Sequence, residues 1–274
     1  MTLLSAAPEP IYRPDIDGLR AIAVLSVILF HINNVLIPGG FVGVDLFFVT
    51  SGFLISLNIL KELEHGQFSL ADFYRRRIKR IAPLMLIVVG ITLVAAQFLL
   101  LPEGAEKTAQ SGLWSLLSLA NVYFWLYQNT SYFAAASSEI PLLHLWSLGY
   151  RGTVLYFLAF NSNGRLSPGT MKLFFVLAAI IALGSFFLAE ILFERAPSFV
   201  YYMLPTRAGE LLVGGLVAFF VLRQIGRKVP KKVVAPMAIV GFLLYAVRRP
   251  SISRISRHCA DPWNSLVDLC RTLQ

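Results

Sequence analysis

The chain has 274 residues, of which 57% are hydrophobic and 14% are charged, and its formal net charge is +9. Soluble domains average about 25% charged residues, so this composition excludes an ordinary soluble protein. It favours a membrane protein in which the apolar residues form helices that cross the bilayer.

Several apolar blocks along the chain have the length of a membrane-spanning helix, which needs about 17–25 residues. The six clearest blocks are residues 21–36, 41–60, 83–101, 173–192, 208–222 and 233–247. Residues 114–127 and 142–160 are weaker candidates. Counting 142–160, the sequence predicts an all-α integral membrane protein with a bundle of about seven transmembrane helices.

The positive charges gather after the second and the fifth of these six blocks. The first group is Lys61, Arg75, Arg76, Arg77, Lys79 and Arg80, and the second is Arg223, Arg227, Lys228, Lys231 and Lys232. The positive-inside rule places both regions, which we expect to be loops, and the N-terminus in the cytoplasm. Because this charge flanks membrane spans, we expect membrane lipid and no nucleic acid as its partner. Residues 1–18 lack a basic leader, so no cleaved signal peptide is expected.

Five motifs occur in an order and spacing that resemble a known family. They are DGLR at 17–20 followed by His31, GGFVGVDLFFVTSGFLI at 39–55, FYRRRIKRIAP at 73–83, LLHLWSLG at 142–149 and APSFVYYMLPTRAGELLVGGLVA at 196–218. Together they resemble the acyltransferase 3 family of bacterial membrane O-acyltransferases.

The resemblance implies a fold of about ten transmembrane helices, of which this chain holds a truncated set. It implies transfer of an acyl group, most simply acetyl, from cytoplasmic acyl-CoA as donor substrate, with no bound cofactor. The acceptors would be hydroxyls of surface or periplasmic glycans such as lipopolysaccharide, peptidoglycan or exopolysaccharide. The protein would lie in the bacterial inner (cytoplasmic) membrane.

Arg20 and His31 are the first pair of candidate catalytic residues. Eleven residues of α-helix bring them to within about 20° of one face and separate them by about 16 Å along the axis. An imidazole can take the proton of an acceptor hydroxyl near neutral pH. Ionisable groups inside a membrane are costly and usually functional, although His31 could instead bond a neighbouring helix. In the family this Arg-x10-His pattern holds the catalytic histidine, and Arg20 would serve the donor or charge the channel.

Asp45 and the pair Arg207–Glu210 are the other charges near predicted spans. Asp45 is a catalytic candidate that could orient His31 or Arg20 or line a polar cavity, or could lie in an interfacial turn. Arg207 and Glu210 are three residues apart, so they can pair on one helical face as a structural pair. Thr206 is expected to be the N-cap of their helix.

The basic motif before the third span is the candidate donor-binding site. Arg76, Arg77 and Arg80 carry guanidinium groups, which suit the phosphates of coenzyme A. Arg77-x-x-Arg80 resembles an Arg-x-x-Arg motif of the family. The alternative is that these residues are only the basic flank of any cytoplasmic loop.

The remaining histidines and cysteines carry weaker signals. His65 has no pattern around it, and His144 is expected to be an interfacial packing residue. Cys259 and Cys270 have no zinc-site spacing, and no metal site is predicted.

The chain departs from the family pattern after residue 149. The family continues with Val/Ile-Glu-Glu-Gln-Phe-Tyr, whose Glu pair would be a partner for the catalytic histidine, but residues 150–164 read YRGTVLYFLAFNSNG. Synonymous codons can be chosen so that the frame one nucleotide later encodes Ile-Glu-Glu-Gln-Phe-Tyr-Ile-Phe-Trp-Pro. A shifted frame across 250–269 similarly yields a Pro-Gly loop and an apolar run. Arginines also gather after residue 247, where seven spans would place the chain outside.

We therefore divide the chain into four parts. They are an N-terminal acyltransferase membrane region at 11–149, an out-of-frame stretch at 150–170, a continuing membrane region at 171–247 and an out-of-frame tail at 248–274. One alternative function is a non-catalytic membrane remnant. A second is a proton-coupled transporter or flippase, which predicts paired repeats that the sequence does not display.

Overall fold

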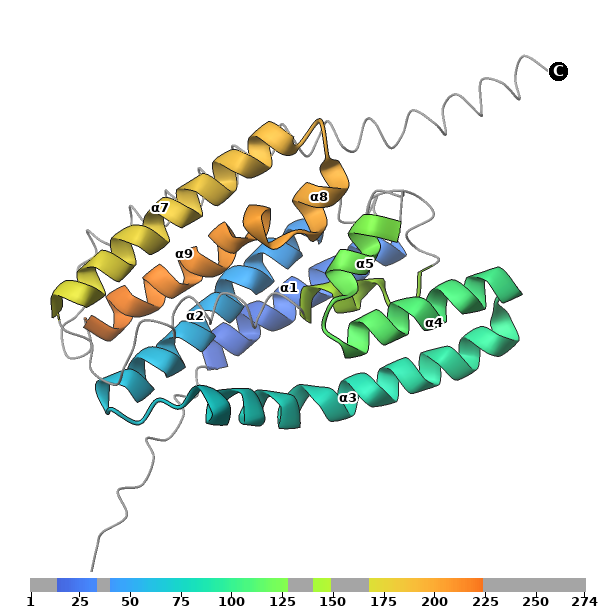
Figure 1. Ribbon diagram of the computed structural model, residues 1–274, viewed down its shortest axis with the longest axis horizontal. Helices are drawn as coiled ribbons and strands as arrows, with labels where there is room; N and C mark the ends of the chain where they lie inside the picture. The colour runs from blue at the N-terminus through green and yellow to red at the C-terminus, as the bar shows by residue number, and fades with distance from the viewer. Residues whose placement is uncertain (1–13, 34–39, 128–139, 149–167, 224–274) are drawn as a thin grey trace, which may run out of the picture.

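The computed structural model describes residues 14–33, 40–127, 140–148 and 168–223, and this part of the chain is helical with no strands (Figure 1). The α-helices are α1 (Pro14–Ile32), α2 (Gly43–Glu64), α3 (Leu70–Leu99), α4 (Pro102–Leu116), α5 (Ala120–Tyr127), α7 (Pro168–Leu192), α8 (Pro197–Tyr202) and α9 (Leu204–Arg223). Two short 3-10 helices, η1 (Gly40–Val42) and η3 (Leu143–Leu148), lie between them. The all-α prediction is confirmed.

Four helical segments of the described chain are long and apolar enough to cross a membrane. They are Gly40–Glu64, Leu70–Leu99, Phe175–Leu192 and Pro197–Arg223. Large apolar side chains on α3 and α7, such as Phe98 and Phe187, are exposed, as lipid-facing residues of a multi-pass membrane protein are. The expected span 21–36 lies in α1 up to Ile32, and 233–247 lies outside the described residues. The count of seven spans therefore stays a prediction.

The prediction that the basic residues after the second span form a loop is wrong. Lys61 lies in the last turn of α2, and the basic residues 75–80 lie inside α3. The helix begins early because the Ser69 hydroxyl accepts the backbone N–H of Asp72 at 3.3 Å, which caps the first turn. Arginine and lysine are good helix formers, so the charged stretch continues the helix into the apolar one.

Neither weaker candidate is seen as a spanning helix in the described part of the chain. Residues 114–127 are divided between α4 and α5 at Ser118, whose φ of 58° is left-handed. Of 142–160, Leu143–Leu148 is the 3-10 helix η3, and residues 149–160 lie outside the described residues.

The tightest helix contact in the bundle joins α2 to α9, which run side by side at its centre (Figure 1). A Cβ atom on Gly52 would overlap the carbonyl oxygen of Leu211, and one on Gly214 would overlap backbone atoms of Val49 and Phe53. The two backbones approach this closely only because both positions lack a side chain. Small residues serve the same purpose at many membrane helix interfaces.

The helix α1 packs on the start of α2 by the same device. A Cβ atom on Gly40 would overlap the carbonyl oxygen of Ser26, and one on Gly43 would overlap that of Ala23. These glycines belong to the string at 39–55, so the motif serves helix packing. The close contact holds the C-terminal half of α1 against η1 and α2.

Aromatic side chains pack together near the start of α2. Phe48 of α2, Trp146 of η3 and Tyr202 of α8 pack together with centroid distances of 5.6 Å for Phe48–Trp146 and 5.7 Å for Trp146–Tyr202. Phe124 of α5 lies 6.0 Å from Tyr202. This cluster holds the six-residue segment η3 against α2, α5 and α8.

Replacing Gly214 by alanine should destabilise the bundle, because the new methyl group meets the backbone of α2 and neither helix can yield without moving. Overpacking of this kind costs about 1–3 kcal/mol. Gly90→Ala in α3 is the matched control, since a Cβ there has no neighbour within 4 Å. The thermal unfolding midpoint in detergent should fall by several degrees for Gly214→Ala alone. Equal midpoints for both variants would contradict the close contact.

Candidate active site

His31 lies one residue before the end of α1 and is half-buried. Its Nδ1 atom is 2.9 Å from the carbonyl oxygen of Val27, one turn earlier. A carbonyl can only accept a hydrogen bond, so Nδ1 carries the proton and donates it. In the neutral ring the basic lone pair is then on Nε2, which is the atom a general base uses.

His144 lies against His31, although the two are far apart in the sequence. Their ring centroids are 5.0 Å apart and the rings are nearly perpendicular, at 83°. Partial burial, and then the nearby His31 ring, lower the pKa of His144 below its usual value. Sequence reasoning assigned His144 to packing. The only signal for another role was its place in the string at 142–149.

Arg20 lies in the second turn of α1, on the same continuous helix as His31. Its Nη1 atom donates to Asp17 Oδ1 at 3.2 Å, and its guanidinium carbon lies 5.3 Å from the ring centroid of Phe47 on α2. Eleven residues of α-helix are about 16 Å, so Arg20 and His31 lie at different depths. Their joint catalytic role stays a prediction.

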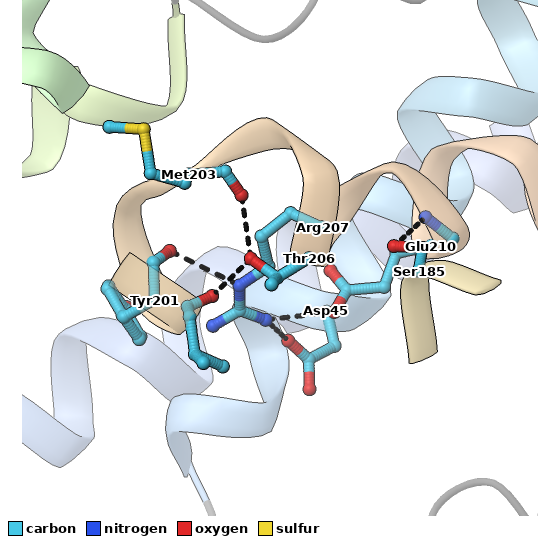
Figure 2. A network of polar contacts seen from close by, with 9 residues as sticks. Asp45, Ser185, Tyr201, Met203, Thr206, Arg207 and Glu210 are labelled. Carbon is cyan, nitrogen blue, oxygen red and sulfur yellow. Dashed lines mark hydrogen bonds and ion pairs between the residues drawn. The ribbon is translucent and has the colours of Figure 1, made fainter. Parts of the chain in front are cut away.

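Asp45 lies in the first turn of α2 and is paired with Arg207 of α9 (Figure 2). Arg207 Nη1 donates to Asp45 Oδ1 at 2.6 Å. The contact joins residues 162 positions apart, which no spacing rule could find. A catalytic role for Asp45 beside His31 or Arg20 stays a prediction, and the ion pair gives this carboxylate a structural task in addition.

Arg207 is the centre of a buried polar network (Figure 2). The same Nη1 atom donates to Glu210 Oε1 at 2.8 Å, the contact expected from their spacing, and Nε donates to the Tyr201 carbonyl oxygen at 3.3 Å. Only 7% of Arg207 and 3% of Glu210 is exposed. The Tyr201 ring lies 4.8 Å from the guanidinium carbon, which adds a cation–π contact.

Thr206 is not the N-cap of α9, and this prediction is wrong. The helix begins two residues earlier, at Leu204, so Thr206 lies inside it. Its hydroxyl lies 2.9 Å from the Val200 carbonyl oxygen and 2.8 Å from that of Met203, to which it can donate (Figure 2). These carbonyls belong to the end of α8 and the residue after it, so Thr206 joins α8 to α9. Pro205 can follow because the first turn of a helix tolerates proline.

The arginines proposed for donor binding lie along the first turns of α3. Arg76 Nη2 donates to Glu62 Oε1 of α2 at 2.6 Å, which ties the two helices together. Arg77 is half-buried and Arg80 is exposed, and their three-residue spacing puts them on one face. Within the described ranges, no three His, Cys, Asp or Glu side chains are grouped so that they could hold a metal ion.

Replacing Arg207 by methionine should destabilise the fold strongly, because two carboxylates lose the guanidinium between them. Removing one partner of a buried ion pair typically costs about 3–5 kcal/mol. The control is Lys107→Met, which breaks the Lys107–Glu103 pair, whose side chains are 66% and 80% exposed. Detergent-solubilised Arg207→Met should unfold well below the control, and adding Asp45→Asn and Glu210→Gln should recover part of the loss. No difference from the control would refute the network's structural role.

Comparisons with known proteins match this sequence over most of its length. The family model described as an acyltransferase domain matches residues 13–247. A peptidoglycan O-acetyltransferase OatA of Listeria monocytogenes is 34% identical over 244 residues, which is 84% of this chain and 38% of that protein. An O-acetyltransferase OatA of Staphylococcus aureus is 32% identical over 251 residues, 87% of this chain and 40% of that protein.

The chain thus spans about two-fifths of the length of these relatives. No solved structure matches it. The family model covers well over half of the chain and includes α1, α2, α3 and α9, which carry the candidate site residues. The chain belongs to the acyltransferase 3 family.

Proposed function

We propose that this protein is a membrane O-acyltransferase that moves an acyl group, most simply acetyl, from acyl-CoA to a hydroxyl of a surface or periplasmic glycan. Family membership and the printed names of the relatives, O-acetyltransferase and peptidoglycan O-acetyltransferase, support this proposal. Acyl-CoA, the glycan acceptor and membrane lipid are the proposed partners. The proposed location is the bacterial inner membrane, with the N-terminus and the donor on the cytoplasmic side.

The observation that carries the proposal is the hydrogen bond between His31 Nδ1 and the Val27 carbonyl oxygen. It fixes the ring in the tautomer whose Nε2 can accept a proton. The ring orientation is also held by Phe30, whose centroid lies 5.6 Å away. An imidazole held in this orientation within a membrane bundle is suited to general-base catalysis on a hydroxyl.

The reaction can be written with this single base. The acceptor oxygen attacks the acyl carbon of the thioester while its proton moves to His31 Nε2. The carbon–sulfur bond then breaks, its electron pair stays on sulfur, and the proton passes from Nε2 to the thiolate. The products are the O-acyl glycan and free coenzyme A, and His31 returns to its starting state.

We propose that Arg77 and Arg80 hold the phosphates of the donor. They share one face of α3 near its start, beside the end of α2. Arg76 is the weaker member of the predicted acyl-CoA site because one of its N–H groups already binds Glu62. Guanidinium groups at the cytoplasmic end of a span would meet coenzyme A before its acyl group enters the bundle.

The second candidate is a non-catalytic remnant, and it is favoured by the missing Glu-Glu-Gln-Phe-Tyr motif at 150–164. Resequencing the gene shows whether this departure comes from a shifted reading frame. Clean codons through 150–170 and 248–274, with no family motif in another frame, would reject the frame hypothesis. An acetyl-CoA-dependent transfer assay on the expressed chain then decides between enzyme and remnant.

Replacing His31 by glutamine should abolish acyl transfer, because an amide cannot take the hydroxyl proton. His65→Gln is a matched control: its Nδ1 contacts the Lys61 carbonyl oxygen at 2.8 Å in the same way, but at the exposed end of α2. Proteoliposomes would receive radiolabelled acetyl-CoA and a peptidoglycan fragment, and the acetylated product would be counted. General bases contribute about 100- to 10,000-fold, so the His31 variant should lose at least the lower figure. Full activity of His31→Gln would remove it from the mechanism.

Replacing Arg77 and Arg80 together by glutamine should raise the KM for acetyl-CoA and leave kcat less changed, since donor binding is weakened rather than proton transfer. Arg75→Gln is the control, because Arg75 is also exposed near the start of α3 but off the Arg77–Arg80 face. Initial rates across a range of acetyl-CoA concentrations measure both constants. An unchanged KM would show that these arginines only mark the cytoplasmic flank.

A further inference from the structure

A second imidazole stands beside the proposed base. His144 comes from η3, which is 113 residues from His31 in the sequence and is brought to it by the fold. The centroid distance of 5.0 Å means that an atom bound at the edge of one ring is within reach of the other. Nothing in the spacing of the two residues predicts this pair.

The segment η3 is built to hold His144 in one place. Leu143 and Trp146 are buried, with 1% and 2% of their surface exposed, and both belong to the aromatic cluster near the start of α2. Trp146 contacts both Phe48 and Tyr201, at centroid distances of 5.6 and 4.9 Å. The partly exposed His144 side chain therefore projects from an anchored backbone.

We propose that His144 is a further catalytic residue, which donates an N–H hydrogen bond to the carbonyl oxygen of the acyl group as His31 activates the acceptor. This inference rests on the proposed acyl transfer. When the acceptor oxygen attacks, the carbonyl π electrons move to oxygen and form an oxyanion. They return when the carbon–sulfur bond breaks, so His144 neither gains nor loses a proton.

The chemistry of the two rings favours His31 as the base and His144 as the hydrogen-bond donor. His31 has its Nδ1 proton held by the Val27 carbonyl, which leaves its other nitrogen for the base role. His144 has a lowered pKa and stays neutral at pH 7, so it retains one N–H donor and does not compete for the hydroxyl proton. A neutral imidazole is a known type of electrophile for a carbonyl oxygen. Two cationic imidazoles at this distance would repel each other.

The test compares His144→Phe with His144→Gln in the transfer assay on the full chain in proteoliposomes. Phenylalanine keeps the ring but has no donor, and glutamine supplies an N–H donor that cannot carry a proton. We expect kcat to fall about 100-fold or more for phenylalanine, as for loss of one oxyanion donor, with an unchanged KM for acetyl-CoA. Glutamine should retain most of the rate. His65→Gln is the control for replacing a histidine outside the site.

The outcomes separate this inference from the proposed function. A phenylalanine variant as fast as the wild type overturns the role of His144 and leaves His31 as the base. A glutamine variant as slow as phenylalanine also overturns it, since it would mean that His144 must carry a proton. A wild-type chain with no transfer overturns the proposed function and this inference with it. His144→Ala replaces phenylalanine if that variant does not fold.

A second measurement does not depend on turnover. The chain has four histidines, whose ring resonances can be assigned in nanodiscs by single glutamine replacements and followed against pH. The pKa of His144 should lie below the ordinary value for a histidine, and it should rise when His31 is replaced by glutamine. An His144 ring that is charged at pH 7 would overturn the donor role, because it would then take part as an acid.

Discussion

The backbones of α2 and α9 meet where Gly52 and Gly214 leave no side chain between them, and the polar interior of the bundle depends on this approach. Across the same two helices, Arg207 on α9 donates a hydrogen bond of 2.6 Å to Asp45 on α2. A wider spacing would separate the buried guanidinium of Arg207 from Asp45, which low-dielectric surroundings make costly. The glycines and the ion network are therefore one structural unit. The start of α2 is also where α1 packs, so the depth of His31 depends on it in turn.

The two candidate catalytic histidines are held beside each other by different parts of the fold. His31 is carried by a long helix that packs on η1 and α2 through glycines. His144 is carried by a short segment whose neighbours are locked into the aromatic cluster with Tyr202. The two rings are therefore held at a defined spacing by the folded segments that carry them. Such preorganisation is what electrostatic stabilisation of an acyl-transfer intermediate requires.

Much of the fold could be predicted from the sequence, because long apolar blocks leave few alternatives in a membrane. The blocks 173–192 and 208–222 lie within α7 and α9, and the block 41–60 lies within η1 and α2. The errors arose where local chemistry competes with hydropathy. Basic residues were assigned to a loop, but the Ser69 cap and their helix propensity place them in α3. Only half of the site could be predicted from the sequence. Spacing along one helix links Arg20 to His31 and Arg207 to Glu210. The contacts of Asp45 and His144 join distant segments, so only the folded structure reveals them.

The Arg207–Asp45 contact also bears on how the protein is made. A guanidinium that enters the hydrocarbon layer alone is expensive to insert, whereas one that finds a carboxylate already present is not. Since the partners are 162 residues apart and Asp45 comes first, synthesis delivers the anion to the membrane well before the cation follows. Arg207 enters with Glu210 on its own helix, and Asp45 of the earlier helix α2 supplies a second carboxylate. A substitution at Asp45 would leave Arg207 with Glu210 as its remaining carboxylate when α9 inserts, which raises the cost of bringing that helix into the bilayer.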